Sequence, residues 1–254
     1  MKMFITGIAA ALASLVGIDP AFADGWGDVR GQVIWSGAAA PAKKEITPNK
    51  DQAHCLSKGP LISDELIVDA KTKGVKNVIV WLAALQAGDK LPIHPNLAVV
   101  PKETVVIDQP CCMFVPRVTV MREGQTLEVK NSAPILHNAK IMGSPTGNGT
   151  INLAIPAGQS IQKQPRAEKR PMSLACDVHT WMGGRIAVFS HPYFALTKDD
   201  GAFEIKNAPA GKFKIVLQHE KLGFLNKGGT IAGQEIEIKS GGTLDLGKIE
   251  AKGE

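Results

Sequence analysis

Residues 176–182 read CDVHTWM. Cys176, His179 and Met182 lie three residues apart, in a chain that has four cysteines. Thiolate, imidazole and thioether suit soft metals, and a trigonal His₂Cys site with a weak axial methionine is the arrangement of blue-copper electron-transfer centres. The spacing therefore predicts a metal site that takes a second histidine from elsewhere in the chain.

The second histidine is predicted to be His137. It lies in the segment VKNSAPILHNAKIM, just after an alternating stretch that ends at Asn131. The chain between His137 and Cys176 is long enough for two or three strands, so a β-sandwich can bring the two residues to the same end. Three other histidines are expected at the surface or at a joint between units: His94, His191 and His219.

The patterning around these motifs predicts an all-β fold. The apolar stretches are short, β-branched and often alternating, as half-buried strands are. The 26 glycines and 16 prolines punctuate them with turn signals, including a predicted turn at Pro209-Ala210-Gly211. Short strands with regular turns are typical of β-sandwiches. Examples are GQVIW (31–35), NVIVWL (77–82), TLEVKN (126–131), GRIAVF (184–189) and FKIVL (213–217).

Three parts are predicted along the chain of 254 residues. Residues 1–23 have the positive start, apolar run and A-x-A spacing of a secretory signal, with cleavage after Ala23. No later apolar run is long enough to cross a bilayer. Residues 24–190 are predicted to form a sandwich with an N-terminal β extension, and residues 191–254 a small sandwich of their own. The signal predicts a periplasmic or secreted protein, in a compartment where cysteines tend to pair.

These segments resemble the cupredoxin (blue-copper) family, with the short copper loop of the amicyanin type. The resemblance implies a cupredoxin-like Greek-key β-sandwich for 24–190, followed by a carboxypeptidase-regulatory-like (transthyretin-like) β-module at 191–254. The chain as a whole is similar to bacterial proteins labelled methylamine-utilisation-like. The matching pieces cover most of the chain after the signal, including GVKNVIVWL, CMFVPRVTVMREGQTLEVKNSAPILHNAKI, CDVHTWMGGRIAVFSHPYFALTKDDGAFEI and APAGKFKIVLQHEKLG.

The resemblance implies one mononuclear type 1 copper site, with ligands His137, Cys176, His179 and axial Met182. It also implies that Asn138 ties the ligand loops together by hydrogen bonds to Asp177. Independently of the resemblance, aromatic and apolar cover from Trp181 and Met142 would limit water at the metal. The chain departs from the family's pattern at two positions. Relatives often have histidine in place of Arg117, and Cys111 is an additional cysteine beside Cys112.

The remaining cysteines leave several pairings open. Cys55–Cys112 is the most economical disulfide, and closing this long loop would stabilise the fold by about 3–4 kcal/mol. Cys111 can take the place of Cys112, because neighbours on a strand point to opposite faces. A vicinal Cys111–Cys112 bond is a less favourable alternative. A second copper site that uses Cys111, Cys112 or His54 is a minor alternative too.

The function predicted from these features is single-electron transfer with a periplasmic redox partner, such as a c-type cytochrome or a dehydrogenase. The alternatives are a copper-binding or delivery protein, or a non-redox envelope interaction module on the same scaffold. An enzyme is not expected, because the chain lacks the His-x-His pairs of multicopper oxidases. The spread net charge of +5 does not predict nucleic-acid binding, and the absence of C-x-x-C-H argues against covalent haem. Zinc also binds thiolate and imidazole, but Met182 favours copper.

Overall fold

The structure is a computed structural model that describes residues 22–252. Most of the predicted secretory signal, residues 1–21, lies outside the described residues. Almost all regular secondary structure of the described chain is β-strand, as the patterning predicted. In this part of the chain, no helix is long and apolar enough to cross a membrane.

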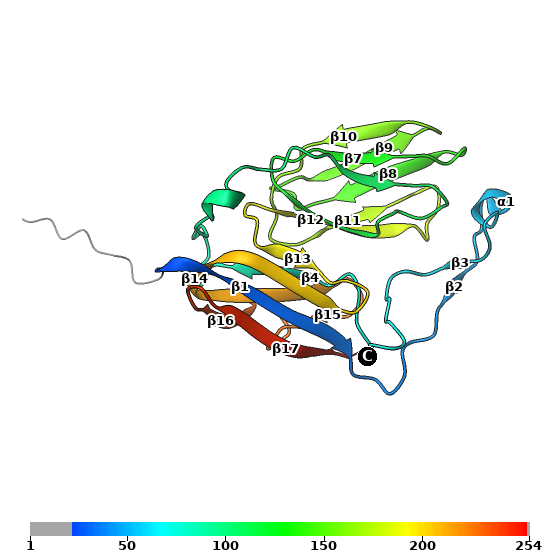
Figure 1. Ribbon diagram of the computed structural model, residues 1–254. Helices are drawn as coiled ribbons and strands as arrows, with labels where there is room; N and C mark the ends of the chain where they lie inside the picture. Colours follow the sequence, from blue (N-terminus) through cyan, green and yellow to red (C-terminus); the bar gives the residue numbers. More distant parts are fainter. Residues whose placement is uncertain (1–21, 253–254) are drawn as a thin grey trace, which may run out of the picture.

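Two sheets form the first sandwich, in the upper part of Figure 1. Its core lies between them, because alternating residues of each strand point inward. On β7, for example, Leu127 and Val129 are buried while Glu128 and Lys130 are half-buried. One sheet has the order β6-β12-β11-β8-β9, with bounds Val118–Arg122, Gly183–Phe189, Met172–Ala175, His137–Met142 and Thr150–Ile155. The other has the order β10-β7-β5, with bounds Ser160–Lys163, Leu127–Lys130 and Val105–Asp108.

A third, seven-stranded sheet lies below this sandwich in Figure 1. Its main order is β13-β4-β14-β1-β17, and two short strands, β15 and β16, also pair with β14. Its core is apolar and includes Val29, Leu82, Tyr193, Phe213 and Ile215. The strands are Phe194–Leu196 (β13), Ile79–Ala83 (β4), Ala202–His219 (β14), Phe22–Trp35 (β1), Thr243–Ala251 (β17), Gly223–Phe224 (β15) and Gln234–Ile238 (β16).

The seven-stranded sheet takes strands from both sides of the predicted boundary at residue 190. Strand β1 pairs antiparallel with β14 and parallel with β17, so it joins the two C-terminal strands. Without β1, β14 and β17 would each present unpaired backbone groups along a long edge. Residues 191–252 therefore do not complete a sandwich of their own; β1 and β4 belong to the same unit.

The turn predicted at Pro209-Ala210-Gly211 is wrong. The chain continues through these residues as one long strand, β14, which pairs first with β1 and then with β4 and β16. Ala208 and Ala210 are fully buried, so this segment packs in the core instead of turning at the surface. Gly211 takes a positive φ of 128° where the strand passes from one set of partners to the other.

The two units pack directly on each other through apolar side chains. Ile79 and Trp81 of β4 face Val118 of β6 and Phe189 of β12. The rings of Trp81 and Phe189 lie 5.6 Å apart. The other face of β4 contributes Val80 and Leu82 to the core of the seven-stranded sheet, so this strand is buried on both faces. The contact fixes one unit against the other.

A small lobe, residues 45–62, projects beside one end of the sandwich (Figure 1). It consists of the paired strands β2 (Glu45–Ile46) and β3 (Leu61–Ile62), with helix α1 (Gln52–Cys55) at its tip. A disulfide bond joins Cys55 of α1 to Cys112, which lies between β5 and β6. No pattern in the sequence indicated this helix, and only a β extension was expected there. The disulfide fastens this N-terminal lobe to the sandwich. A further short 3-10 helix, η1, spans Pro95–Leu97.

Two histidines away from the ligand loops have lowered pKa values: His219, which is buried, and His191, which is half-buried. Burial lowers the pKa of His219 to about 4, and the positive charges of Arg117 and Lys221 act in the same direction. Burial and the charge of Arg122 likewise lower the pKa of His191 to about 4. His219 Nδ1 accepts a hydrogen bond from the backbone N–H of Lys221 at 3.2 Å. Protonation of either ring would put an uncompensated charge into the fold.

Stability should therefore fall as the pH is lowered from 6.5 towards 4. In that range the unfolded chain binds protons that the folded chain does not, which contributes about 3 kcal/mol per histidine. In His219→Asn, the side-chain oxygen can still accept the N–H two residues on. We expect urea unfolding of the metal-free variant to lose about 3 kcal/mol less between pH 7 and pH 4 than the unsubstituted protein. An equal loss in both proteins would contradict a neutral buried His219.

Candidate metal centre

The loop between β11 and β12 holds Cys176, His179 and Met182. Cys176 directly follows β11, and Met182 directly precedes β12. The loop is closed by two backbone hydrogen bonds, from Cys176 N–H to the Met182 carbonyl at 3.3 Å and from Met182 N–H to the His179 carbonyl at 2.9 Å. The short closed loop brings all three side chains into the protein.

His137 reaches the same place from a neighbouring strand. It is the first residue of β8, which pairs antiparallel with β11. Because the strands are antiparallel, the start of β8 lies beside the end of β11, where Cys176 follows. The sheet therefore brings together the histidine and the loop that the sequence predicted as one site.

Three potential metal-binding atoms converge between these elements. The Nδ1 atoms of His137 and His179 lie 2.9 Å apart. Cys176 Sγ lies 4.0 Å from His137 Nδ1 and 3.9 Å from His179 Nδ1. Bonds of about 2.0 Å to nitrogen and 2.3 Å to sulfur place the ligand atoms of one metal about 3–4 Å apart. The spacing of the donor atoms fits a single ion bound between them.

The burial of the site is consistent with a metal centre. Both imidazoles are fully buried, and Cys176 is 2% exposed. Met182 is also 2% exposed and lies in the same apolar cluster as Cys176. Two imidazoles and a thiol that converge, with a buried thioether in the same loop, are a donor set for a soft metal.

The electrostatic environment keeps His137 in the form that binds metals. Burial is the main cause that lowers the pKa of His137 to about 4, and the charges of His179 and His54 contribute in the same direction. Asp51 acts in the opposite direction. At neutral pH the ring of His137 is thus neutral and retains a lone pair for a metal.

Asn138 connects the two ligand-bearing elements. Its Oδ1 accepts hydrogen bonds from the backbone N–H groups of Asp177 at 2.7 Å and Val178 at 3.2 Å, and from Cys176 Sγ at 3.1 Å. Its Nδ2 donates to Asn152 Oδ1 at 2.8 Å. These bonds hold the loop against β8 in the way that the resemblance implied for Asn138 and Asp177.

Asp177 extends this network across the outside of the sheet. Its carboxylate accepts from Asn152 Nδ2 at 2.7 Å and lies 3.3 Å from Lys140 Nζ. The hydrogen bond from Asn152 is the main reason that the pKa of Asp177 is lowered, with Lys140 adding to it. The ionised side chain therefore braces the loop from its solvent side.

Trp181 and the disulfide cover the other side of His179. The ring of Trp181 contacts that of His179 edge to face at a centroid distance of 5.2 Å, and its Nε1 donates to the Cys112 carbonyl at 3.1 Å. The sulfur atoms of Cys55 and Cys112 and a ring nitrogen of His179 all lie within 4.8 Å of one another. While the disulfide is formed, its two cysteines are not thiolate ligands.

Sequence reasoning missed one residue of the site, Asp51. Its Oδ2 lies 2.8 Å from His179 Nε2, although the two residues are 128 positions apart. No local motif marks this pairing, because Asp51 lies in the N-terminal lobe and reaches the site only through the tertiary fold.

The other residues singled out in the sequence lie elsewhere or have other partners. Cys111 is a half-buried free thiol. Arg117, at a position where the resemblance implied histidine in similar proteins, is 8% exposed. Its guanidinium pairs with Glu220 and, at 2.7 Å, with Asp64. A guanidinium held by two carboxylates links the sandwich to the segment after β3 and to the turn after β14; it offers no lone pair to a metal.

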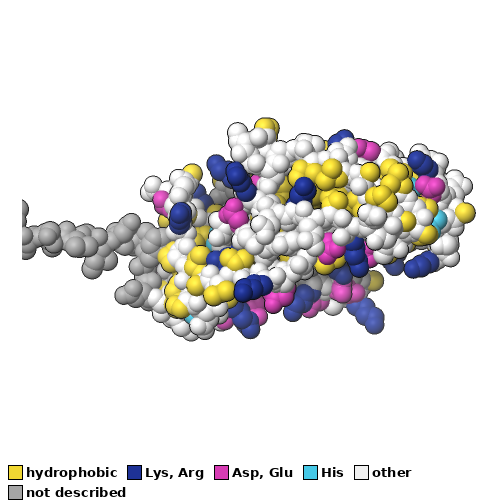
Figure 2. All heavy atoms as spheres, turned by 90° about the horizontal axis from the view of Figure 1, so that it is seen from above, with side chains coloured by type: hydrophobic (Ala, Val, Ile, Leu, Met, Phe, Trp, Pro, Cys, Tyr) yellow, Lys and Arg dark blue, Asp and Glu magenta, His cyan; other side chains and the backbone are white. Residues whose placement is uncertain are grey.

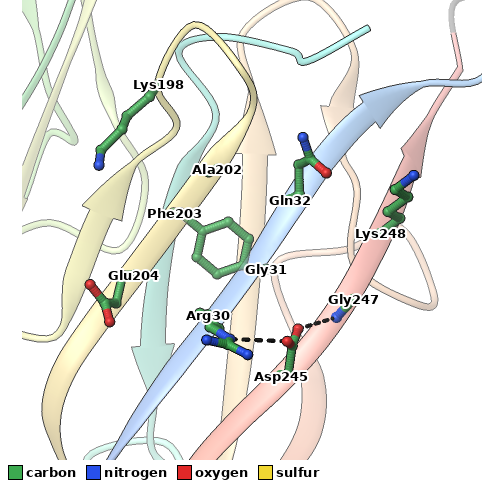
Figure 3. Close-up of a pocket in the computed structure, with 10 residues that line it drawn as sticks. All are labelled: Arg30, Gly31, Gln32, Lys198, Ala202, Phe203, Glu204, Asp245, Gly247 and Lys248. Carbon is green, nitrogen blue, oxygen red and sulfur yellow. Dashed lines mark hydrogen bonds and ion pairs between the residues drawn. The ribbon is translucent and has the colours of Figure 1, made fainter. Parts of the chain in front are cut away.

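A hollow of about 590 Å³ lies on the seven-stranded sheet (Figure 3). It is open at the positions of Gly31 and Gly247, which carry no side chains, and Phe203 lies beside Gly31. A Cβ at Gly31 would come within 2.8 Å of the Phe203 ring, so glycine is required for strand packing there. Arg30 at the edge is already paired with Asp245 at 3.0 Å. The hollow thus follows from the packing of β1 against β14 and β17.

Comparisons with known proteins give partial structural likenesses. No protein-family model matches the chain, and no curated protein matches it significantly. A purple cupredoxin from Nitrosopumilus maritimus is 18% identical, with a TM-score of 0.29, over 34% of this chain and 99% of that one. A reduced amicyanin variant is 19% identical, with a TM-score of 0.30, over 40% of this chain and 100% of that one.

A copper-containing nitrite reductase from Thermus scotoductus is 18% identical, with a TM-score of 0.32. The match covers 39% of this chain and only 25% of that protein. Likenesses at these TM-scores are too loose to assign a ligand or a function.

Proposed function

We propose that this protein binds one copper ion at His137, Cys176, His179 and Met182 and acts as a single-electron carrier. The observation that carries the proposal is the convergence of two imidazole nitrogens 2.9 Å apart on a thiol about 4 Å from each, in a fully buried position. Copper bound there would supply a one-electron Cu(I)/Cu(II) couple, and this donor set is the one that type 1 copper uses.

The rigidity of the site supports electron transfer. Asn138 clamps the ligand loop to β8, and two backbone hydrogen bonds close the loop on itself. Ligands that are held in this way change position little when an electron arrives or leaves. A copper-delivery protein needs a site that solvent and a recipient can reach, whereas these four side chains are 0–2% exposed. The burial therefore favours a carrier over delivery.

A redox protein is the partner we propose, such as a c-type cytochrome or a dehydrogenase in the periplasm. Leu136, next to the ligand His137 in sequence, is 49% exposed, and Leu56, next to Cys55 in the N-terminal lobe, is 39% exposed. Figure 2 shows hydrophobic side chains gathered in the right half of the face seen from above. Apolar side chains near a buried metal would favour brief, close docking.

We further propose that the protein works outside the cytoplasm and is not itself an enzyme. The apolar start of the sequence and the formed disulfide support export, because disulfides persist in oxidising compartments. The four proposed ligand side chains are 0–2% exposed, so a substrate would have little access to a copper ion held among them. A carrier needs only the metal and a docking surface.

The test is to add Cu(II) to the metal-free protein and record visible absorption and electron paramagnetic resonance. We expect one copper per chain, an intense visible thiolate-to-copper band and a narrow copper hyperfine splitting. A Cys111→Ser variant is the matched control, since it removes the other free thiol and should leave the spectra unchanged. A colourless protein, or a band that disappears in Cys111→Ser, would refute the proposed site. Loss of copper to a chelator within seconds would favour delivery.

A further inference from the structure

The N-terminal lobe approaches the proposed copper site through one carboxylate. Asp51 stands at the N-cap position of α1, and its Oδ2 lies 2.8 Å from His179 Nε2. The opposite ring nitrogen of His179, Nδ1, faces His137 and Cys176. The same imidazole is therefore held by the lobe on one side and faces the metal position on the other.

The side chain of Asp51 does not form the hydrogen bond that is usual for an aspartate at the N-cap of a helix. Aspartate at an N-cap normally accepts a hydrogen bond from the first turn of its helix. Here no such side-chain bond is formed; the carboxylate is directed to His179 instead. The backbone of Asp51 is in the left-handed region, with φ 49° and ψ 35°. The conformation of the lobe at Asp51 therefore favours the contact with His179 over a contact within the lobe.

The disulfide fixes the lobe at the same place. Cys55 is four residues after Asp51 and is bonded to Cys112, whose carbonyl accepts the Trp181 indole N–H. Trp181 in turn packs edge to face on His179. Asp51, the disulfide and Trp181 together enclose His179, which is fully buried although it lies in a surface loop.

The chemistry of a carboxylate on the far nitrogen of a ligand histidine is specific. When Nε2–H donates to Asp51, the proton is fixed on Nε2 and the lone pair of Nδ1 is free for the metal. A carboxylate partner also orients the ring and strengthens the imidazole as a ligand. Neutral acceptors orient a ring as well, but they do not add the negative charge.

We propose that Asp51 is a positioning residue for His179, and that the disulfide-anchored lobe is a cap that retains the metal. The inference rests on the proposed copper function. Asp51 fixes the tautomer and orientation of His179 and lowers the rate at which the metal escapes. The metal can leave only after the lobe moves or the ring of His179 turns, and both movements break the Asp51 contact.

The test compares Asp51→Ala and Asp51→Asn with the unsubstituted protein. Glu45→Gln is the matched control, because it removes an exposed carboxylate from β2 of the same lobe. The first measurement is nitrogen-15 NMR of the His179 ring in the metal-free proteins. We expect the Nε2–H tautomer in the unsubstituted protein, in Asp51→Asn and in Glu45→Gln, and a mixture of tautomers in Asp51→Ala.

The second measurement is the rate at which copper passes to a chelator, followed by the visible band. We expect Asp51→Ala to lose copper about 10–100-fold faster, the range typical for an outer hydrogen-bond partner of a ligand. Asp51→Asn should fall between the two, and Glu45→Gln should match the unsubstituted protein. The copper hyperfine splitting and reduction potential should shift in the same order, which a purely structural role in the lobe would not produce.

The outcomes separate this inference from the proposed function. Equal copper retention and equal spectra in Asp51→Ala would overturn the role of Asp51 while leaving the copper site intact. A changed tautomer with no thiolate band in the unsubstituted protein would overturn the copper function and the cap together. Faster loss in Glu45→Gln than in Asp51→Asn would show a general charge effect and overturn the specific contact.

Discussion

Cys176→Ser is expected to abolish the visible copper band and to weaken Cu(II) binding by more than 100-fold. The thiolate is the ligand whose sulfur-to-copper charge transfer gives the band, and a serine hydroxyl is neither ionised at neutral pH nor a soft donor. Loss of an outer hydrogen-bond partner typically lowers metal affinity 10–100-fold, and loss of a direct ligand should exceed this. The measurement is a competitive Cu(II) titration with absorption spectra.

The substitution should leave the fold intact, which makes its result interpretable. Serine is close in size to cysteine, and Asn138 Oδ1, 3.1 Å from Cys176 Sγ, can accept a hydroxyl hydrogen bond. The urea midpoint of the metal-free variant should therefore stay close to that of the unsubstituted protein. A band that persists in Cys176→Ser would place the copper on another sulfur, and the proposed ligand set would be wrong.

Removing the disulfide should have the largest effect on stability. For the metal-free Cys55→Ala/Cys112→Ala variant, we expect the free energy of unfolding to fall by about 4 kcal/mol. The bond joins residues 57 positions apart, and the chain-entropy model gives this value for a loop of that length. Urea unfolding at pH 7 is the measurement. Alanine is chosen because both cysteines are almost fully buried, so serine hydroxyls would be unsatisfied there.

Cys111→Ala provides the control for this experiment. Cys111 is adjacent to Cys112 but is half-buried and unbonded, so its loss should change the free energy of unfolding by less than about 1 kcal/mol. Similar losses in the two variants would mean that the segment around Cys112 is sensitive to any change, and that the cross-link itself contributes little.

The predictable part of the site is the part that is contiguous in sequence. Cys176, His179 and Met182 lie within seven consecutive residues, so the sequence alone shows that they can bind one metal together. His137 could be added because it follows a strand in a pattern that resembles a known arrangement. Asp51 carries no such signal, because a single aspartate in a polar loop looks like any solvated charge until the disulfide brings its lobe to the ligand loop.

The fold, like the site, was predictable only where it depends on residues that are close in sequence. Alternation of apolar and polar residues predicted most of the strands, since burial of one face depends only on neighbouring residues. The partner of each strand was not predictable in this way, because β1 pairs with β14 and β17, which lie about two hundred positions away in sequence. The segment around Pro209 was mistaken for a turn because proline and glycine usually mark turns, whereas here Ala208 and Ala210 are drawn into the core.

The central position of β1 has a consequence for the order of folding. Arg30 on β1 is bonded to Asp245, 215 positions later, so the sheet cannot close until nearly the whole described chain has been synthesised. Contacts between such distant residues raise the contact order and slow the search for the native state. Until β14 and β17 arrive, β1 has two unpaired edges that can join other chains. The first strand of the described chain is thus among the last to gain its partners in the sheet.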